Sequence, residues 1–332
     1  MAKAKTLVIQ PLQGIGDYMW FVPHLHALAN TTPEKKISLL TRPRSFADQL
    51  SAEDPMIDDV IWLEIKKGQH DGLCGLWRLA QVLRKKKYTK AYILHSRSLR
   101  YPLLCRMAGI PKIYGPGMGW QKVLLHGANT FLRKEDQKKH PIQRATQVIK
   151  NHGLSLEESS GLHLGWAEKE AEEFLASMKP PYFALCIGSS EAQKKWPMEY
   201  YIQLAEMIAH RKKGTILILG GPSEVVEGKN IEMALNHKKI PAFFVSGDLR
   251  FTLGVLKKVA FIVGNDTGVT HAAPRLGVKG LVLLGQSQVP IHHYTNLEGF
   301  KLEFDTKIPA LNAMDKIDPK KVMSELVRLK WF

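Results

Sequence analysis

A carboxylate and two glycines lie close to the N-terminus, directly after an apolar run. The segment reads Gly14-Ile15-Gly16-Asp17. The glycines allow another backbone to approach closely, and the Asp17 carboxylate could serve as a general base or as the cap of the following helix. Spacing alone does not separate these two roles. The segment is not a dinucleotide fingerprint, because the third glycine is missing.

A second stretch combines hydroxyl groups with a lysine. Gly188 permits a tight turn after an apolar run, and the hydroxyls and amides of Ser189 and Ser190 can surround a phosphate oxygen. Lys194 supplies a positive charge for the same anion. The stretch lacks G-x-x-x-x-G-K-S/T, so it is not a Walker loop. The pattern favours an anion site at the end of a strand.

A third stretch, Leu219–Glu224, reads LGGPSE. A plain turn between a strand and a helix explains the glycines and the proline. Glu224 adds a carboxylate at the position where nucleotide-binding folds hold the vicinal hydroxyls of a ribose. The sequence therefore predicts a contact between Glu224 and a ribose.

A fourth stretch, GNDTGVTH, precedes an expected helix over Val269–Leu276. Asp266 and Thr267 are residue types that cap a helix, and Gly268 leaves room above the first turn. The free amides and the positive dipole end of such a helix attract phosphate. An ordinary capped helix is the alternative, and His271, one turn into the helix, favours a ligand site.

The elements that must position these loops alternate between strands and helices. Expected strands are Thr6–Gln10, Ile37–Leu40, Val60–Leu63, Tyr92–Leu94, Ile113–Gly115, Phe183–Ile187, Thr215–Leu219, Ala242–Val245, Phe261–Val263 and Leu281–Leu284. Expected helices are Asp17–Ala29, Phe46–Leu50, Leu73–Lys86, Leu99–Met107, Ile142–His152, Glu168–Met178, Glu199–Arg211, Val225–His237, Thr252–Val259, Val269–Leu276 and Pro319–Leu329. This rhythm predicts an α/β fold with two doubly wound, mostly parallel sheets.

The segment Leu154–Trp166 separates the two series of elements. We expect an N-terminal domain over residues 1–160, a C-terminal domain over 161–312, and a closing helical segment over 313–332 that could pack back on the N-terminal domain. Ligands of doubly wound sheets bind at the carboxyl ends of the strands. All four stretches above occupy such ends.

The charge of the chain points to an anionic partner. Lys and Arg number 47 against 31 Asp and Glu, a net charge of +16. Nucleic acid, an anionic membrane surface and phosphorylated substrates all suit such a charge. Most of the basic clusters, including Arg84–Lys87, lie in the first half. They lack interleaved aromatic residues and a recognition-helix motif, which weighs against nucleic acid.

The cysteines and the apolar runs indicate a compartment. Cys74, Cys105 and Cys186 are odd in number and lack metal-ligand spacing, which favours a reducing, cytoplasmic location and no metal site. No apolar run reaches membrane-spanning length, and the N-terminus shows no signal-peptide pattern.

Taken together, the motifs GxGD, GSS-x-x-x-K-x-W-P, LGGPSE and GNDTGVTH resemble the ADP-heptose:lipopolysaccharide heptosyltransferase family, glycosyltransferase family nine. Their order and spacing match from Gly14 to Gly285. The resemblance implies a GT-B fold with two Rossmann-like domains, the acceptor on the first and the nucleotide-sugar on the second. It implies inverting transfer of heptose from ADP-heptose to the inner core of lipopolysaccharide, without a cofactor or a required protein-bound metal.

The resemblance also implies roles for single residues. Asp17 would be the general base. The donor-binding set would be Ser189, Ser190, Lys194, Glu224, Asp266, Thr267, Gly268 and His271. The acceptor side would hold Gly14, Gly16, Arg97 and Arg100, facing a phosphorylated glycolipid on the cytoplasmic face of the inner membrane, with peripheral contact to that surface. Lys194 is preferred to Lys195 because the family pattern is K-x-W-P.

Two departures from the family pattern flank the expected donor site. Pro274 stands in the helix where the family usually has a small residue, and Gln286–Pro290 replaces a G-P-T or G-S-T continuation. A different nucleotide-sugar on the same architecture, a relative that binds without catalysis, and a basic nucleic-acid-binding protein are the alternatives.

Overall fold

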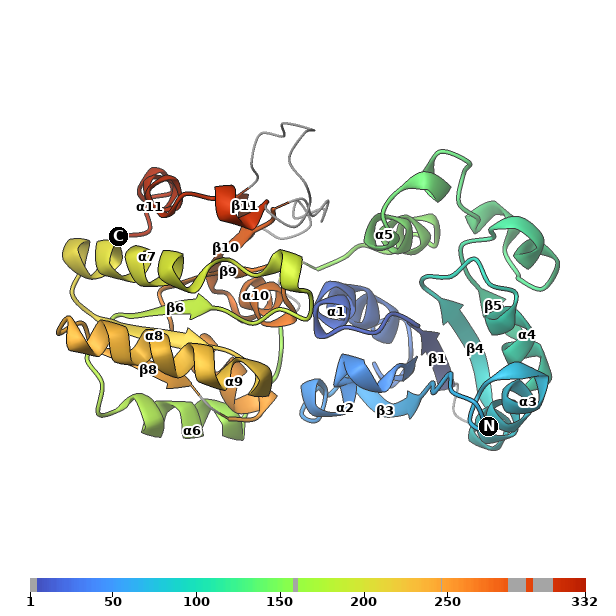
Figure 1. Cartoon of the computed structure of the whole chain (residues 1–332). Coiled ribbons are helices and arrows are strands. Elements are labelled where there is room, and N and C mark those ends of the chain that lie inside the picture. Colours follow the sequence, from blue (N-terminus) through green and yellow to red (C-terminus); the bar gives the residue numbers. More distant parts are fainter. Residues whose placement is uncertain (1–4, 158–160, 246, 286–296, 301–312) are drawn as a thin grey trace. The chain divides into compact units, whose positions relative to one another are not determined.

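The computed structural model describes residues 5–157, 161–245, 247–285, 297–300 and 313–332. The chain forms two compact units, Met1–His163 and Leu164–Phe332. Each unit contains one sheet whose strands all run parallel, with helices packed on it (Figure 1). The predicted α/β class with two parallel sheets is confirmed.

The first unit has five strands in the order β3-β2-β1-β4-β5. They are β1 Lys5–Ile9, β2 Ile37–Thr41, β3 Ile57–Trp62, β4 Tyr88–Ile93 and β5 Lys112–Tyr114. Its helices are α1 Ile15–Ala29, α2 Ala47–Leu50, α3 Gly72–Lys86, α4 Arg100–Met107 and α5 Pro141–Asn151. Because the chain moves from β1 outward to β3 and then returns to β4, the strand order reverses between β1 and β4.

One face of this sheet is covered by α3 and α4. Leu76, Leu79 and Leu83 recur at helical spacing on α3, and all three are buried in a cluster with strand residues such as Leu7 and Ile93. On α1, every residue from Tyr18 to Ala29 is buried, and this helix packs against α5. The packed helices therefore fix the sheet, and with it the positions of the residues that follow β1 and β4.

The second unit has six strands in the order β11-β10-β9-β6-β7-β8. They are β6 Tyr182–Cys186, β7 Thr215–Leu219, β8 Ala242–Val245, β9 Phe261–Asn265, β10 Lys279–Leu283 and β11 Leu297–Phe300. Its helices are α6 Trp166–Leu175, α7 Met198–Arg211, α8 Val225–His237, α9 Leu249–Leu256, α10 Gly268–Ala272 and α11 Pro319–Arg328. Here the strand order reverses between β6 and β9.

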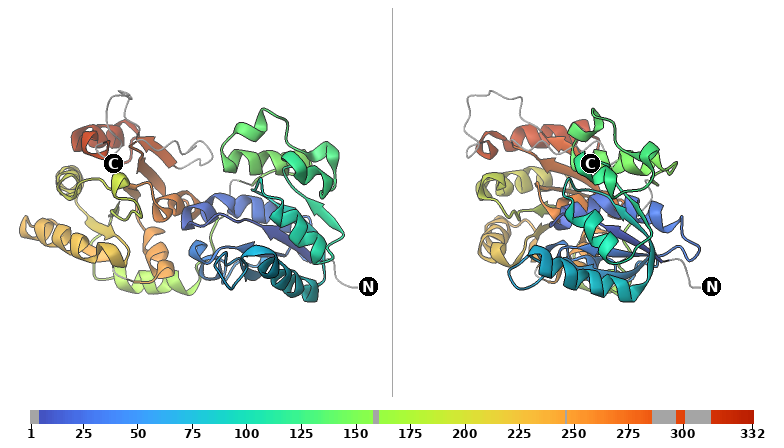
Figure 2. Two further views of the ribbon diagram at one scale, coloured as in Figure 1. Left: turned by 45° about the vertical axis from the view of Figure 1, so that its right-hand side comes forward. Right: turned by 90° about the vertical axis from the view of Figure 1, so that its right-hand side faces the viewer.

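Helices lie in layers on this second sheet (Figure 2). One hydrophobic cluster joins the alternate residues of the strands to α7, α8 and α11, and includes Leu204, Ile231 and Leu326. Helices α6 and α9 pack against each other. Helix α11 packs against α7 within this unit. The idea that the closing segment reaches the first domain stays a prediction.

Several elements differ from the expected ones. Strands β3 and β4 begin at Ile57 and Tyr88 rather than at Val60 and Tyr92. Helix α9 begins at Leu249 rather than Thr252, because the Asp248 carboxylate accepts the Phe251 amide and starts the helix earlier. Helix α10 ends at Ala272 and continues as a 3₁₀ turn over Ala273–Leu276, where Pro274 cannot donate an α-helical hydrogen bond. Strand β11 was not expected from the sequence. The Gln286–Pro290 departure lies outside the described residues.

Among these described segments, no helix is both long and apolar enough to cross a bilayer. The same part of the chain holds no group of three or more His, Cys, Asp or Glu side chains able to ligate a metal ion.

Candidate active site

Most candidate residues follow strands that flank the reversal of strand order in each sheet, whereas Glu224 follows β7, the next strand beyond β6. In the first unit, Asp17 follows β1 and Arg97 follows β4. In the second unit, Lys194 follows β6 and Asp266 follows β9. Loops on either side of such a reversal separate and leave a crevice, which is where open α/β sheets bind ligands.

Asp17 sits in the first turn of α1, and its carboxylate reaches back to the start of the helix. Its Oδ2 accepts the amide of Gly14, the N-cap residue, at 2.8 Å. Acidic residues in a first turn stabilise a helix through both this bond and the dipole. Asp17 is therefore not the N-cap residue, but its carboxylate caps the helix from the first turn by accepting the N-cap amide. Its role as a general base stays a prediction.

Lys194 links the loop after β6 to the loop after β9. Its Nζ lies 2.7 Å from Glu191 Oε1 and 3.4 Å from Asp266 Oδ2. Partial burial lowers the pKa of Lys194, but the hydrogen bond to Glu191 and the charge of Asp266 outweigh burial and raise this pKa above its usual value. The ammonium group is fully charged at neutral pH and stands at the reversal between β6 and β9.

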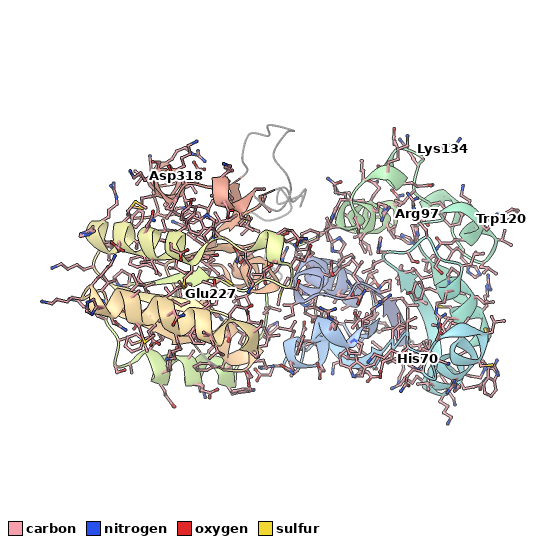
Figure 3. The ribbon with its side chains drawn as sticks, in the orientation of Figure 1. His70, Arg97, Trp120, Lys134, Glu227 and Asp318 are labelled. Atoms are coloured by element: carbon pink, nitrogen blue, oxygen red, sulfur yellow. The ribbon has the colours of Figure 1, made fainter. Side chains whose placement is uncertain are left out.

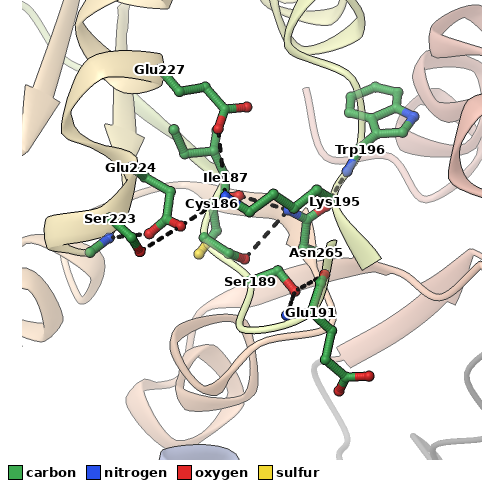
Figure 4. Close-up of polar contacts among 12 residues, drawn as sticks. Cys186, Ile187, Ser189, Glu191, Lys195, Trp196, Ser223, Glu224, Glu227 and Asn265 are labelled. Atoms are coloured by element: carbon green, nitrogen blue, oxygen red, sulfur yellow. Dashed lines mark hydrogen bonds and ion pairs between the residues drawn. The ribbon is translucent and has the colours of Figure 1, made fainter. Parts of the chain in front are cut away.

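Lys195 makes a parallel link to the third loop (Figure 4). Its Nζ lies 2.9 Å from Glu224 Oε1 and 3.8 Å from Glu227 Oε2. Burial raises the pKa of Glu224, but hydrogen bonds from Lys195, Ser223 and the Gly221 amide outweigh it and lower the pKa below its usual value. Glu224 is thus an ionised, buried carboxylate at the start of α8. Its predicted ribose contact is not tested.

A buried amide holds the two loops of the reversal together. Asn265, the last residue of β9, is fully buried. Its Oδ1 accepts the Trp196 amide at 3.0 Å, and its Nδ2 donates to the Ile187 carbonyl at 2.8 Å (Figure 4). One residue before it, Gly264 lies so close to β6 that a Cβ would stand 2.4 Å from the Cβ of Cys186. The loops therefore have a fixed spacing.

The start of α10 differs from the expected cap. Thr267 is the N-cap residue, but its side chain makes no hydrogen bond to the helix amides, so the cap prediction is wrong for Thr267. Asp266 instead binds His271, with Oδ1 and Nε2 2.8 Å apart and both side chains at most 7% exposed. Ser189 uses its hydroxyl to accept the Glu191 amide and donate to the Glu191 carbonyl, and Ser190 is exposed.

Cations gather after β4 in the first unit. Arg97 donates to the Gln137 carbonyl at 3.0 Å, and Arg144 of α5 donates to the same carbonyl at 3.2 Å. Arg144 also lies 3.1 Å from His95 Nδ1. Burial, then the charges of Arg144 and other cationic neighbours, lower the pKa of His95 to about 4. His95 is therefore neutral at physiological pH, beside two permanent positive charges.

Arg100 has different surroundings from Arg97, although the sequence places the two residues in one candidate set. The Nε and Nη2 atoms of Arg100 are buried and make no hydrogen bond among the described residues. After burial, the charge of Arg100 is one cause of the lowered pKa of His70. The shared acceptor role of Arg97 and Arg100 stays a prediction.

Some site residues escaped the sequence analysis. Asn265 lies beyond the expected strand Phe261–Val263, and the family pattern favours Lys194 over Lys195. A polar residue at the last position of an apolar strand is the signal that could have identified Asn265. The Lys195–Glu224 pair joins loops 29 residues apart in sequence, and no local pattern marks it.

Comparison with known proteins identifies the family to which this chain belongs. A family model described as glycosyltransferase family 9 (heptosyltransferase) matches residues 76–293. No curated protein matches the chain. ADP-heptose lipopolysaccharide heptosyltransferase II of E. coli superimposes with a TM-score of 0.74 and 21% identity over 98% of both chains.

Two further solved structures agree in fold. A family 9 glycosyltransferase from Veillonella parvula has a TM-score of 0.76 and 18% identity over 98% of this chain and 97% of its own. E. coli heptosyltransferase WaaC with ADP-2-deoxy-2-fluoro heptose has a TM-score of 0.72 and 16% identity over 98% and 99%. The fold is therefore GT-B, with two Rossmann-like units. The chain belongs to glycosyltransferase family 9, the heptosyltransferase family, and is a glycosyltransferase.

Proposed function

We propose that this enzyme transfers heptose from ADP-heptose to the inner core of lipopolysaccharide, with inversion at the anomeric carbon. The observation that carries the proposal is the pair of charged links from the loop after β6, Lys194–Asp266 to the loop after β9 and Lys195–Glu224 to the loop after β7. In this proposal, the two ammonium groups and two carboxylates at these strand ends would meet the phosphates and hydroxyls of a nucleoside diphosphate sugar. The family assignment and a WaaC structure with an ADP-heptose analogue support this donor.

In the proposed reaction, Asp17 takes the proton of the acceptor hydroxyl. The acceptor oxygen then attacks the anomeric carbon, the bond from that carbon to the donor phosphate oxygen breaks, and ADP leaves with the negative charge. Lys194 and the amides at Ser189 and Ser190 stabilise this charge. Carboxylates repel phosphate, so Asp266 and Glu224 contact sugar hydroxyls instead.

The remaining predicted residues have supporting places in this scheme. Thr267, Gly268 and His271 lie at the start of α10 beside Asp266, and in this scheme the His271–Asp266 contact fixes the carboxylate that would meet the donor sugar. Gly14 and Gly16 lie beside Asp17, and the absence of side chains at these positions would let an acceptor hydroxyl approach the carboxylate. Arg97 and Arg100 provide positive charge for a phosphorylated glycolipid.

The proposed acceptor implies a place at the cytoplasmic face of the inner membrane, with peripheral contact. The basic cluster Arg84–Lys87 at the end of α3 supports this, because each exposed cation near an anionic bilayer contributes about 1 kcal/mol of attraction. Co-sedimentation with phosphatidylglycerol vesicles should fall with added salt. Equal binding to phosphatidylcholine vesicles would count against contact through charge.

A donor and acceptor panel tests the proposal. The purified enzyme is given ADP-heptose, ADP-glucose or a UDP-sugar together with heptose-deficient lipopolysaccharide, and the acceptor mass is measured. We expect one added heptose with ADP-heptose and no addition with the other donors. Transfer of another sugar would replace the donor assignment. No transfer by an enzyme that still binds ADP would reject it.

A further inference from the structure

A pocket opens in the second unit at the amino ends of its strands, the end opposite to the candidate active site. It encloses about 670 Å³ and lies among the last turn of α7 and the residues that precede β7 and β8. Figure 3 labels Glu227 in the first turn of α8, and the pocket lies beyond the other end of this helix. A strand of five residues such as β7 spans about 16 Å. A small ligand in the pocket therefore does not reach Lys194 or Glu224.

Positive charge dominates the lining of this pocket. Among the described residues that line it, one is acidic, Glu206, and four are lysines, Lys179, Lys213, Lys238 and Lys239. Glu206 pairs with Lys238. The other three lysines form no ion pair with any residue that the structure describes. Three ammonium groups are thus available to a ligand.

The ends of two helices account for only part of this charge. Helices α7 and α8 end beside the pocket, at Arg211 and His237. The unpaired carbonyl groups of each helix end carry about half a negative charge, so the two ends together carry about one. Four ammonium groups against one carboxylate exceed that requirement and leave about two positive charges over. Stabilisation of the helix ends alone does not explain this excess.

Hydrogen bonds fix the walls of the pocket. Thr215 Oγ1 donates to the Lys179 carbonyl at 2.8 Å, which joins the segment before β6 to the start of β7. The Asn236 side chain donates to the Ala242 carbonyl at 3.0 Å and accepts the Ala242 amide at 3.1 Å, which ties the end of α8 to β8. The Lys239 amide donates to the Asn236 carbonyl at 2.9 Å. The backbone positions of the lysines are therefore set before any ligand binds.

The remaining side chains of the pocket are partly apolar. Ala209, Ile240 and Pro241 supply the apolar part of the lining. Such surface suits a carbon skeleton, while lysine ammonium groups bind phosphate as mobile point charges. The volume lies in the range of ligand pockets, which run from about 300 to 1,000 Å³. These features together suit a small molecule with more than one anionic group.

We propose that this pocket binds a ligand carrying at least two phosphate groups, held by Lys179, Lys213 and Lys239, at a site separate from the donor site. Two phosphates supply the negative charge that the excess of positive charge requires. Closely spaced phosphates occur on soluble polyphosphorylated molecules and on the headgroup of cardiolipin. The inference goes beyond the proposed transfer of heptose and does not depend on it.

The test is a calorimetric titration of sodium tripolyphosphate into the full-length enzyme. The ionic strength is about 0.1 M, at which exposed charges more than about 10 Å apart are largely screened from each other. Lys213→Gln/Lys239→Gln should weaken binding about tenfold or more, because two charge-assisted contacts are lost.

A charge-matched double variant serves as the control. Lys212 and Lys320 are exposed lysines of the same unit that do not line the pocket. Lys212→Gln/Lys320→Gln removes the same charge and should leave binding within about twofold of the unaltered enzyme. Equal losses in the two double variants would show attraction to the whole unit and overturn the pocket assignment. Absence of binding by the unaltered enzyme would overturn it as well.

Lys194→Gln separates the pocket from the candidate donor site. It should leave binding of tripolyphosphate to the pocket in place, because Lys194 contacts Asp266 at the other end of the sheet. Binding that is lost in Lys194→Gln and kept in Lys213→Gln/Lys239→Gln would place the anion in the donor site and overturn the inference.

Vesicles distinguish the two sources of phosphate. Co-sedimentation is compared between phosphatidylcholine vesicles with and without cardiolipin. Binding to cardiolipin that falls in Lys213→Gln/Lys239→Gln, and not in the charge-matched control, would support the pocket and assign it to a lipid headgroup. Pocket-dependent binding of tripolyphosphate without such binding to cardiolipin would support the pocket and assign it to a soluble ligand.

Discussion

The two units use positive charge in opposite ways at the same place in their sheets. In the second unit, Lys194 and Lys195 are each paired with carboxylates from neighbouring loops. In the first unit, Arg97 and Arg144 bind a backbone carbonyl, and Arg144 stands beside a neutral histidine. Under the proposed function, the paired site would recognise the donor by geometry, since its charges are already compensated. The unpaired site attracts any anion that fits.

The largest effect should come from removing the proposed base. Asp17→Asn keeps an oxygen that can accept the Gly14 amide, so the start of α1 should survive. The amide cannot take a proton, and kcat should fall by about 10²–10⁴-fold with unchanged ADP affinity. Steady-state kinetics and calorimetric titration of ADP measure the two quantities. An unchanged kcat in Asp17→Asn would show that Asp17 is not the base and serves only to cap α1.

A second comparison concerns the buried amides that fasten each site. Asn265 joins the loops of the second unit, and Gln121 joins those of the first. Each alanine substitution leaves buried backbone groups without partners, which costs about 1–3 kcal/mol per group. Denaturant unfolding should show both losses. We expect Asn265→Ala to weaken ADP binding and Gln121→Ala to weaken acceptor binding. Weaker acceptor binding by Asn265→Ala and weaker ADP binding by Gln121→Ala would instead assign the acceptor to the second unit and the donor to the first.

Much of this fold could be predicted from sequence, because the bounds of many elements depend on residues that are close together in the chain. Strand β7, helix α8 and strand β8 have the expected bounds, because each is an apolar or periodic run between clear turn residues. Helix α9 was placed three residues late, since its start depends on one capping carboxylate, Asp248. The candidate loops could be located because parallel strands end at one edge of a sheet.

The contacts within the loops could not be predicted in this way. The Lys195–Glu224 pair and a first-unit cavity lined by Arg97 and Trp120 depend on which side chains tertiary packing brings together. Trp120 lies in a segment without periodicity, so its exposure has no signature in the sequence.

Salt should have the next largest effect. It should distinguish the paired lysines of the second unit from the unpaired cations of the first. Raising ionic strength from about 0.05 M to about 0.3 M shortens the screening length from roughly 14 to 6 Å. The exposed, uncompensated cations of the first unit should then lose attraction, and the acceptor KM should rise several-fold. The dissociation constant of ADP should change less, because the lysines of the second unit are already paired. Equal salt dependence of both constants would contradict the comparison.

The smallest effect should be a pH dependence centred on His95. Its pKa is lowered to about 4 in the folded chain, while that of an unfolded histidine is about 6.5. The unfolded state therefore binds more protons between these values, and the free energy of unfolding should decrease as pH falls from about 6.5 toward 4. His95→Gln should flatten this part of the profile in denaturant titrations. An unaltered slope would mean that other groups control it.

The most direct test asks whether the donor and the acceptor bind to separate units. It compares two variants in one kinetic experiment. Lys194→Gln removes the cation of the β6/β9 reversal. Lys134→Gln/Lys138→Gln removes two cations that line a cavity in the first unit together with Arg97. Initial rates of heptose transfer are measured over a grid of ADP-heptose and acceptor concentrations. We predict that the donor KM rises about tenfold only in the first variant and the acceptor KM only in the second. A rise of both constants together in either variant would contradict the assignment of donor and acceptor to separate units.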